Sequence, residues 1–307
     1  MAGPIASPIP MPAASCVPEA VPAGSSASLL DQRPGLRRLI QWGGAGAVAL
    51  SIGFIGERLW RLDLAQLQNS ATWPLAAAML AAAGLFAAAD AALARGWAAL
   101  ADPAGQLGAR QAAAIYGRGV LLKYLPGSVF QYVSRQVEGS GAGLPQRQLA
   151  GASLKEVGLH IAASLSVAGC CVVASAQPLL AGLLGAGFAS LAVIGRNPML
   201  RAFGYQFFAF AGFAAAAAIV GAVLLPGGAS IALFAALFLL AWLAGFVVPI
   251  APGGIGVREA ALLALAGPTV AAAPLLAAVL ALRAGSIAGD LLFGLRATLR
   301  ATLRGQS

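Results

Sequence analysis

Charge is scarce in this chain of 307 residues. Only 9% of the residues are Asp, Glu, Lys or Arg, whereas 60% are hydrophobic. A typical soluble domain contains about 25% charged residues, because its surface must face water. The scarcity of charge therefore excludes a soluble enzyme, and the hydrophobic content excludes a disordered chain. Apolar runs of about 20 residues predict an all-α, polytopic bundle of transmembrane helices.

Histidine and cysteine are also rare, with one histidine and three cysteines in the chain. The cysteines show no spacing typical of a disulfide framework or a metal site. No P-loop, nucleophile elbow or His-Glu-x-x-His motif is found. We therefore expect no metal and no cofactor. The net charge of +9 does not indicate nucleic acid, because the basic residues lie mostly between apolar runs, where they contact lipid headgroups.

Seven apolar runs are predicted to cross the membrane. They lie at about 39–56, 74–94, 151–176, 178–195, 203–225, 229–250 and 270–292. Each is close to the about 20 residues that a helix needs to span the hydrocarbon layer. Arginines before the first run and after the last place both termini in the cytoplasm by the positive-inside rule. Two cytoplasmic termini require an even number of crossings, whereas seven clear apolar runs are found. Two broken segments, described below, are the source of this conflict. The sequence therefore predicts seven or eight crossings of the plasma (inner) membrane.

The chain divides into three parts. Residues 1–34 are rich in Pro, Ala, Ser and Gly, and they lack the apolar stretch of a signal peptide. We expect them to form a disordered cytoplasmic tail. Residues 35–300 are predicted to form a single transmembrane domain, and residues 301–307 a basic cytoplasmic tail.

A Pro-Gly pair interrupts the helical pattern within residues 116–135. Pro126 lacks the backbone N–H that a helix needs, and Gly127 loosens the backbone, so a helix is expected to break there. Lys123 and Arg135 lie on either side of the break. The segment is predicted to be a hairpin of two helices or one interrupted crossing.

A second break lies in the segment from Pro249 to Ala261. Pro252, Gly253 and Gly254 precede a helical pattern that begins near Gly256. The N-terminus of that helix would present free N–H groups to the break. Arg258 adds a planar set of donors suited to phosphate, and Glu259 follows it. Broken helices in the two halves of a chain often mark a transporter's substrate site, so we predict an anion site here.

Ionisable residues within the apolar runs are further candidates, because charge is costly in a membrane. Glu156 and His160 are four residues apart and share a helix face, where a hydrogen bond or a proton relay is predicted. The alternative is that this end of the helix lies at the membrane interface. Asp90, Arg283 and Asp290 are expected to be neutralised by partners on other helices.

Two motifs together resemble a known family. Lys123-Tyr-Leu-Pro-Gly127 with Arg135, and Pro249-x-x-Pro-Gly-Gly-Ile-Gly-Val-Arg-Glu-Ala260, are similar to the transmembrane region of lysylphosphatidylglycerol synthases, a flippase-like family of integral membrane proteins. The resemblance covers roughly residues 35–300. It implies a multi-helix bundle with re-entrant segments that moves or handles lipids. The sequence departs from the commoner pattern at Ser128 and Gln131, and it contains no soluble transferase domain, so we do not expect lysine transfer.

These features predict a lipid transporter, rather than an enzyme, that binds a phospholipid or lipid-linked headgroup at the two breaks. The predicted substrate-binding residues are Lys123, Pro126, Gly127, Arg135, Pro252, Gly253, Gly254, Arg258 and Glu259. Glu156 and His160 are predicted to couple protons or charge. One alternative is an integral membrane transferase with Glu138, Glu156 or Glu259 as general base. Another is a membrane scaffold for a separate synthase or glycosyltransferase.

Overall fold

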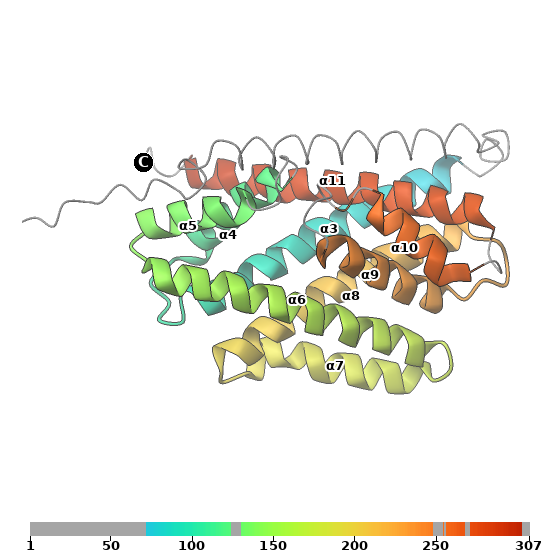
Figure 1. The fold of residues 1–307 in the computed structure, drawn as a ribbon, viewed down its shortest axis with the longest axis horizontal. Coiled ribbons are helices and arrows are strands. Elements are labelled where there is room, and N and C mark those ends of the chain that lie inside the picture. Colours follow the sequence, from blue (N-terminus) through green and yellow to red (C-terminus); the bar gives the residue numbers. More distant parts are fainter. Residues whose placement is uncertain (1–71, 124–129, 248–253, 255, 268–270, 303–307) are drawn as a thin grey trace, which may run out of the picture. The chain divides into compact units, whose positions relative to one another are not determined.

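A computed structural model describes residues 72–123, 130–247, 254, 256–267 and 271–302. Within these ranges the chain forms nine helices and no strand (Figure 1). The helices are α3 (Thr72–Ala101), α4 (Ala109–Leu122), α5 (Phe130–Gly141), α6 (Gln146–Ala174), α7 (Pro178–Ile194), α8 (Pro198–Leu224), α9 (Ile231–Val247), α10 (Val257–Ala266) and α11 (Ala272–Thr302). The predicted all-α fold class is confirmed for this part of the chain.

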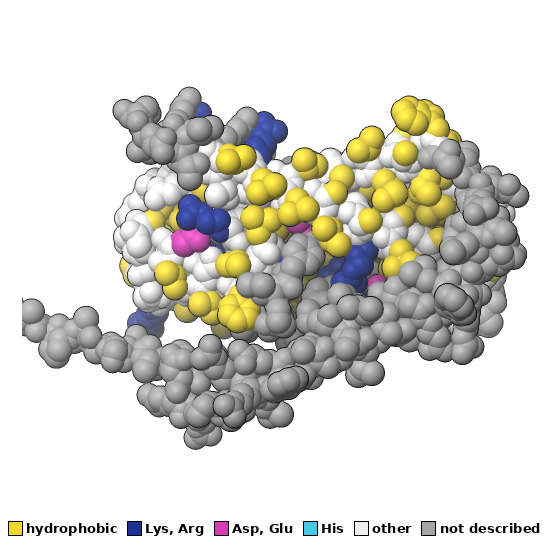
Figure 2. All heavy atoms as spheres, turned by 90° about the horizontal axis from the view of Figure 1, so that it is seen from above, with side chains coloured by type: hydrophobic (Ala, Val, Ile, Leu, Met, Phe, Trp, Pro, Cys, Tyr) yellow, Lys and Arg dark blue, Asp and Glu magenta, His cyan; other side chains and the backbone are white. Residues whose placement is uncertain are grey.

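Four of the helices, α3, α6, α8 and α11, are long and apolar enough to cross a membrane. Helices α7 and α9 are also apolar but have 17 residues each, which corresponds to a length of about 26 Å. Figure 2 shows hydrophobic side chains spread over one face of the described helices, with few charged groups among them. These features agree with a membrane-embedded protein. The run at 39–56 lies outside the described residues, so seven or eight crossings stays a prediction.

Small residues allow the long helices to approach closely. Helix α3 packs against both α8 and α11. A side-chain carbon added at Gly289 of α11 would lie 2.6 Å from Cβ of Phe86 and 2.8 Å from the backbone oxygen of Ala83, both on α3. Lipid provides no hydrophobic drive for helix association, so close backbone contact of this kind stabilises membrane bundles. Gly289 therefore sets the distance between α3 and α11.

The first predicted break separates α4 from α5, because α4 ends at Leu122 and α5 begins at Phe130. The two helices pack against each other. A carbon added at Gly119 of α4 would lie 3.0 Å from the backbone oxygen of Gln131 on α5. Of the two interpretations of this segment, the structure therefore supports the helical hairpin. Pro126 and Gly127 lie outside the described residues.

The second predicted break separates α9 from α10. Helix α9 ends at Val247, and α10 begins at Val257 with Gly256 as its N-cap, as the sequence predicts. Helix α10 has 10 residues and is therefore about 15 Å long, which is half of what a crossing requires. It packs against α9. Pro252 and Gly253 lie outside the described residues.

Candidate functional site

A cavity of about 410 Å³ is lined by described residues from both of the predicted broken segments. Its walls are mostly apolar and aromatic, and they include Trp242 and Phe246 of α9. Among the described residues, four cationic side chains line it, namely Lys123, Arg135, Arg258 and Arg283. The carboxyl groups of Asp90, Glu259 and Asp290 and the imidazole of His160 line it as well. The cavity therefore combines apolar walls with charges of both signs.

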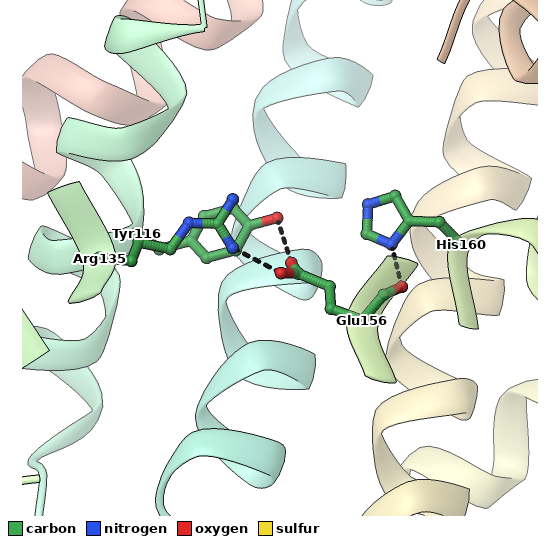
Figure 3. Close-up of polar contacts among 4 residues, drawn as sticks. All are labelled: Tyr116, Arg135, Glu156 and His160. Carbon is green, nitrogen blue, oxygen red and sulfur yellow. Dashed lines mark hydrogen bonds and ion pairs between the residues drawn. The ribbon is translucent and has the colours of Figure 1, made fainter. Parts of the chain in front are cut away.

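Arg135 of α5 is held by a buried ion pair. Its Nη1 lies 2.6 Å from Oε2 of Glu156 on α6, and the two side chains are only 3% and 2% exposed. The hydroxyl group of Tyr116 donates a hydrogen bond of 3.0 Å to the other carboxylate oxygen (Figure 3). The guanidinium carbon lies 4.1 Å from the ring centre of Tyr116 and 5.2 Å from that of Tyr132. Side chains from α4 and α6 therefore hold the guanidinium group of Arg135 in place at the cavity wall.

His160 lies one helical turn from Glu156, but the two side chains point in different directions. Nδ1 of His160 lies 2.9 Å from the backbone oxygen of Glu156, whereas the Glu156 carboxylate turns to Arg135 and Tyr116 (Figure 3). The imidazole ring stacks on Phe246, with ring centres 5.3 Å apart. The predicted contact between Glu156 and His160 therefore exists, but it reaches the main chain and not the carboxylate.

Glu259 of α10 forms a second buried ion pair. Its Oε1 lies 3.1 Å from Nη1 of Arg283 on α11, and Glu259 is 1% exposed. The other carboxylate oxygen accepts a hydrogen bond of 2.7 Å from the backbone N–H of Gly256. The sequence predicts that the N–H groups at this helix end are free for an anion. The structure corrects this for Gly256, because the helix supplies its own carboxylate.

Arg258 lies in a narrow space between α9 and the start of α10. Its guanidinium carbon is 5.3 Å from the ring centre of Trp242. A carbon added at Gly245 would lie 2.5 Å from Cγ of Arg258, and one added at Gly254 would lie 2.7 Å from Nε. Two glycines therefore make room for this arginine at the cavity wall. Gly254, a predicted site residue, has a φ of +72°, which L side chains rarely adopt.

Lys123, at the C-terminal end of α4, forms the third ion pair. Its Nζ lies 2.7 Å from Oδ2 of Asp290 on α11. The sequence predicts that Arg283 and Asp290 find partners on other helices, and both predictions are confirmed by the pairs with Glu259 and Lys123.

The structure brings the described site residues to one place. Lys123, Arg135, Gly254, Arg258 and Glu259 all line the cavity, as does His160, and Glu156 lies behind Arg135. Sequence reasoning missed Tyr116, and it favoured a structural role for the acids of α3 and α11. Tyr116 carries no local signal, whereas an aspartate inside an apolar run is itself a signal of function.

Within the described ranges, no three His, Cys, Asp or Glu side chains gather in a way that could hold a metal ion. Comparison of the chain with family models, with curated proteins and with solved structures finds no match. The cavity and its charges are therefore the basis on which a function can be inferred.

Proposed function

We propose that this protein is a membrane lipid transporter that binds the headgroup of an anionic or lipid-linked substrate in the cavity. The observation that carries the proposal is the convergence of both broken segments on one cavity: the hairpin of α4 and α5 supplies Lys123 and Arg135, and α10 supplies Arg258. Broken helices that meet inside a membrane bundle are the usual site of substrate binding in transporters. The resemblance to the flippase-like family points to the same class of substrate.

The chemistry of the cavity suits a phosphate group with a small headgroup. Guanidinium and ammonium groups form charge-assisted hydrogen bonds to phosphate oxygens. A volume of about 410 Å³ is within the range of small-molecule sites. It suffices for a headgroup but not for two acyl chains, so the chains would stay among the apolar helix surfaces outside.

The buried ion pairs define how such a headgroup would bind. Lys123, Arg135 and Arg283 each have a carboxylate partner on another helix. An incoming anion must therefore share a cation with a carboxylate or displace it. Exchange of one anion for another keeps the cation neutralised throughout, which matters because an uncompensated charge is costly at membrane depth.

The transferase alternative is less well supported by these contacts. Each of the three glutamates that could act as general base is bound to an arginine: Glu138 to Arg118, Glu156 to Arg135 and Glu259 to Arg283. A scaffold, for its part, has no need of charged groups gathered around a cavity. We therefore propose transport as the function.

Lipid movement in liposomes tests this proposal. The purified protein is expected to carry headgroup-labelled phosphatidylglycerol between leaflets, measured as label accessible to an external quencher. Arg258→Ala is expected to slow the movement at least about tenfold, since a hydrogen bond to a charged group contributes about 1.5–3 kcal/mol. Arg118→Ala is the matched control, because Arg118 pairs with Glu138 outside the cavity. Wild-type protein that moves no labelled lipid of any headgroup class would overturn the proposal.

A further inference from the structure

The exposed basic side chains of the described residues gather at one end of the helix bundle. Four of the described cations line the cavity, and the other eight are all exposed. These eight are Arg95, Arg110, Arg118, Arg147, Lys155, Arg196, Arg201 and Arg296. Of the described acids on the same helix ends, Asp102 is buried and Glu138 is paired with Arg118. This basic end is therefore a strongly positive surface.

Contacts between the helices show that these side chains share one end. Gln148 at the start of α6 donates a hydrogen bond of 2.8 Å to the backbone oxygen of Ala101 at the end of α3. A carbon added at Gly96 of α3 would lie 3.3 Å from the backbone oxygen of Ala202 near the start of α8. A carbon added at Gly117 of α4 would contact the last turns of α11. The end of α3, the starts of α6 and α8 and the end of α11 thus lie together (Figure 1).

The opposite end of the bundle is uncharged in the part of the chain that the structure describes. It is formed by the starts of α3, α9 and α11, the ends of α8 and α10 and the turn between α6 and α7 (Figure 1). Residues 72–80, 170–180, 222–234 and 271–276 contain no Asp, Glu, Lys or Arg. On the face that Figure 2 shows, the dark blue groups likewise leave one end of the bundle free. A one-sided distribution of basic residues is typical of the cytoplasmic side of a membrane protein.

The basic end lies one membrane thickness from the uncharged end. Each of the four membrane-length helices carries an exposed cation toward its basic end, and the distance along the helix follows from a rise of about 1.5 Å per residue. This distance is about 35 Å from Thr72 to Arg95, about 29 Å from Ala174 to Lys155, about 35 Å from Leu224 to Arg201 and about 36 Å from Ala272 to Arg296. Because the hydrocarbon layer is about 30 Å thick, all four cations fit the headgroup level of one leaflet.

Exposed apolar side chains beside these cations favour lipid over a soluble partner. Val193 and Ile194 at the end of α7 are 85% and 68% exposed, and the exposed Arg196 follows them. Leu154 is 77% exposed beside Lys155. Apolar side chains next to Lys or Arg are typical of the membrane interface, where the apolar groups face acyl chains and the cations face headgroups. A soluble acidic protein would leave these apolar side chains in water.

We propose that the basic end is the surface that binds the anionic lipid headgroups of the cytoplasmic leaflet, and that this contact fixes the orientation of the bundle in the membrane. Positive charge attracts anionic lipid, and the basic end presents eight cations to it. The inference does not depend on the proposed lipid transport, because it rests on surface charges outside the cavity.

This orientation assigns the two broken segments to opposite sides of the membrane. Helix α4 follows the end of α3, and α5 precedes the start of α6, so their hairpin enters and leaves at the basic end. With 14 and 12 residues, α4 and α5 are about 21 and 18 Å long, which is too short for a crossing. Helix α9 begins and α10 ends at the uncharged end (Figure 1). One hairpin thus enters from the cytoplasm and the other from the opposite side.

The orientation also changes the number of crossings. Five described helices, namely α3, α6, α7, α8 and α11, connect the two ends of the bundle (Figure 1). Together with the predicted crossing at 39–56 they make six, and six is even, as two cytoplasmic termini require. The apolar run at 229–250 contains α9 and belongs to a hairpin. Seven apolar runs are therefore compatible with an even number of crossings.

Cysteine labelling in intact cells tests the orientation. The three native cysteines are replaced by alanine, and single cysteines are then added at exposed positions. Gln106 lies in the loop after α3 at the basic end, whereas Gln177 precedes α7 at the uncharged end. A membrane-impermeant maleimide is expected to label Gln177→Cys in intact cells, but Gln106→Cys only after the membrane is permeabilised. Any other pattern of labelling would overturn the orientation.

Fluorescence quenching on a single helix tests the lipid partner. Helix α7 exposes Val193 at the basic end and Leu179, which is 78% exposed, at the uncharged end. A fluorophore on Val193→Cys, in nanodiscs of equal phosphatidylglycerol and phosphatidylcholine, is expected to be quenched more strongly by nitroxide-labelled phosphatidylglycerol than by nitroxide-labelled phosphatidylcholine. Arg196→Gln is expected to lower this preference about fivefold, because the attraction of one basic residue to anionic lipid is lost.

The same fluorophore on Leu179→Cys is the matched control, and it is expected to show no preference between the two lipids. Equal preference at the two ends of α7, or a preference at Val193 that Arg196→Gln does not change, would overturn the binding of anionic headgroups. If the label on Val193→Cys shows no preference at all, lipid is the wrong partner and a soluble acidic protein takes its place as the candidate.

Discussion

Arg135→Ala is expected to lower the free energy of unfolding by about 3–5 kcal/mol, which is the usual cost of removing one partner from a buried ion pair. The variant leaves Glu156 buried, and among the described residues its carboxylate keeps only the hydrogen bond from the Tyr116 hydroxyl. Thermal or denaturant unfolding in detergent micelles measures the loss. Arg118→Ala is the matched control, because the Arg118 side chain is 45% exposed and its pair with Glu138 lies at the surface. Its expected cost is about 0–1 kcal/mol.

A double variant separates the charge from the packing around it. Arg135→Met combined with Glu156→Gln removes both charges and keeps two side chains of similar size. Replacing a whole buried pair is often nearly neutral, so most of the lost stability is expected to return. If Arg135→Ala proves as mild as Arg118→Ala, the Arg135–Glu156 pair is not the closed, buried contact described above.

Gly289→Ala is expected to destabilise the fold by about 3 kcal/mol, at the upper end of the usual cost of overpacking. The added carbon would meet backbone and Cβ atoms of α3 at 2.6–2.9 Å, and backbone atoms cannot rotate away. Helices α3 and α11 would have to separate along their contact. The same unfolding measurement checks this expectation.

Gly182→Ala is the control for the packing argument. Gly182 lies within α7, and a carbon added there meets no atom within 4 Å. Alanine is favoured over glycine inside a helix by about 1 kcal/mol, so this variant is expected to be neutral or slightly stabilising. Equal destabilisation by the two alanine substitutions would show that the helix contact at Gly289 does not limit stability.

The sequence predicts local features of this protein well. The start of α10 at Val257 follows from the pattern after Gly256, and the break between α4 and α5 follows from a Pro-Gly pair. Both are local effects of backbone chemistry, because proline and glycine act on their own turn of the chain. Glu156 and Arg258 are also predicted as site residues from the sequence, because a charged residue within or beside an apolar run is unusual.

The pairing of charges between helices could not be predicted in the same way. Asp290 of α11 pairs with Lys123 at the end of α4, and α11 lies close against α3 at Gly289, which is one of many glycines of similar appearance. In a chain so rich in alanine and glycine, no periodic pattern distinguishes a close contact from an open helix face. Gly182 and Gly289 look alike in the sequence, and only three-dimensional packing separates them.

The ion pairs also impose an order on assembly during synthesis. The ribosome makes Asp90 early and Asp290 near the end of the chain, with most of the bundle between them. A charged residue at the centre of a membrane helix costs about 2.5–3.5 kcal/mol on insertion scales. Lys123 is therefore synthesised long before Asp290, its ion-pair partner on α11. Packing of α11 is the step that forms this ion pair, and a nascent chain that stops before α11 leaves Lys123 without Asp290.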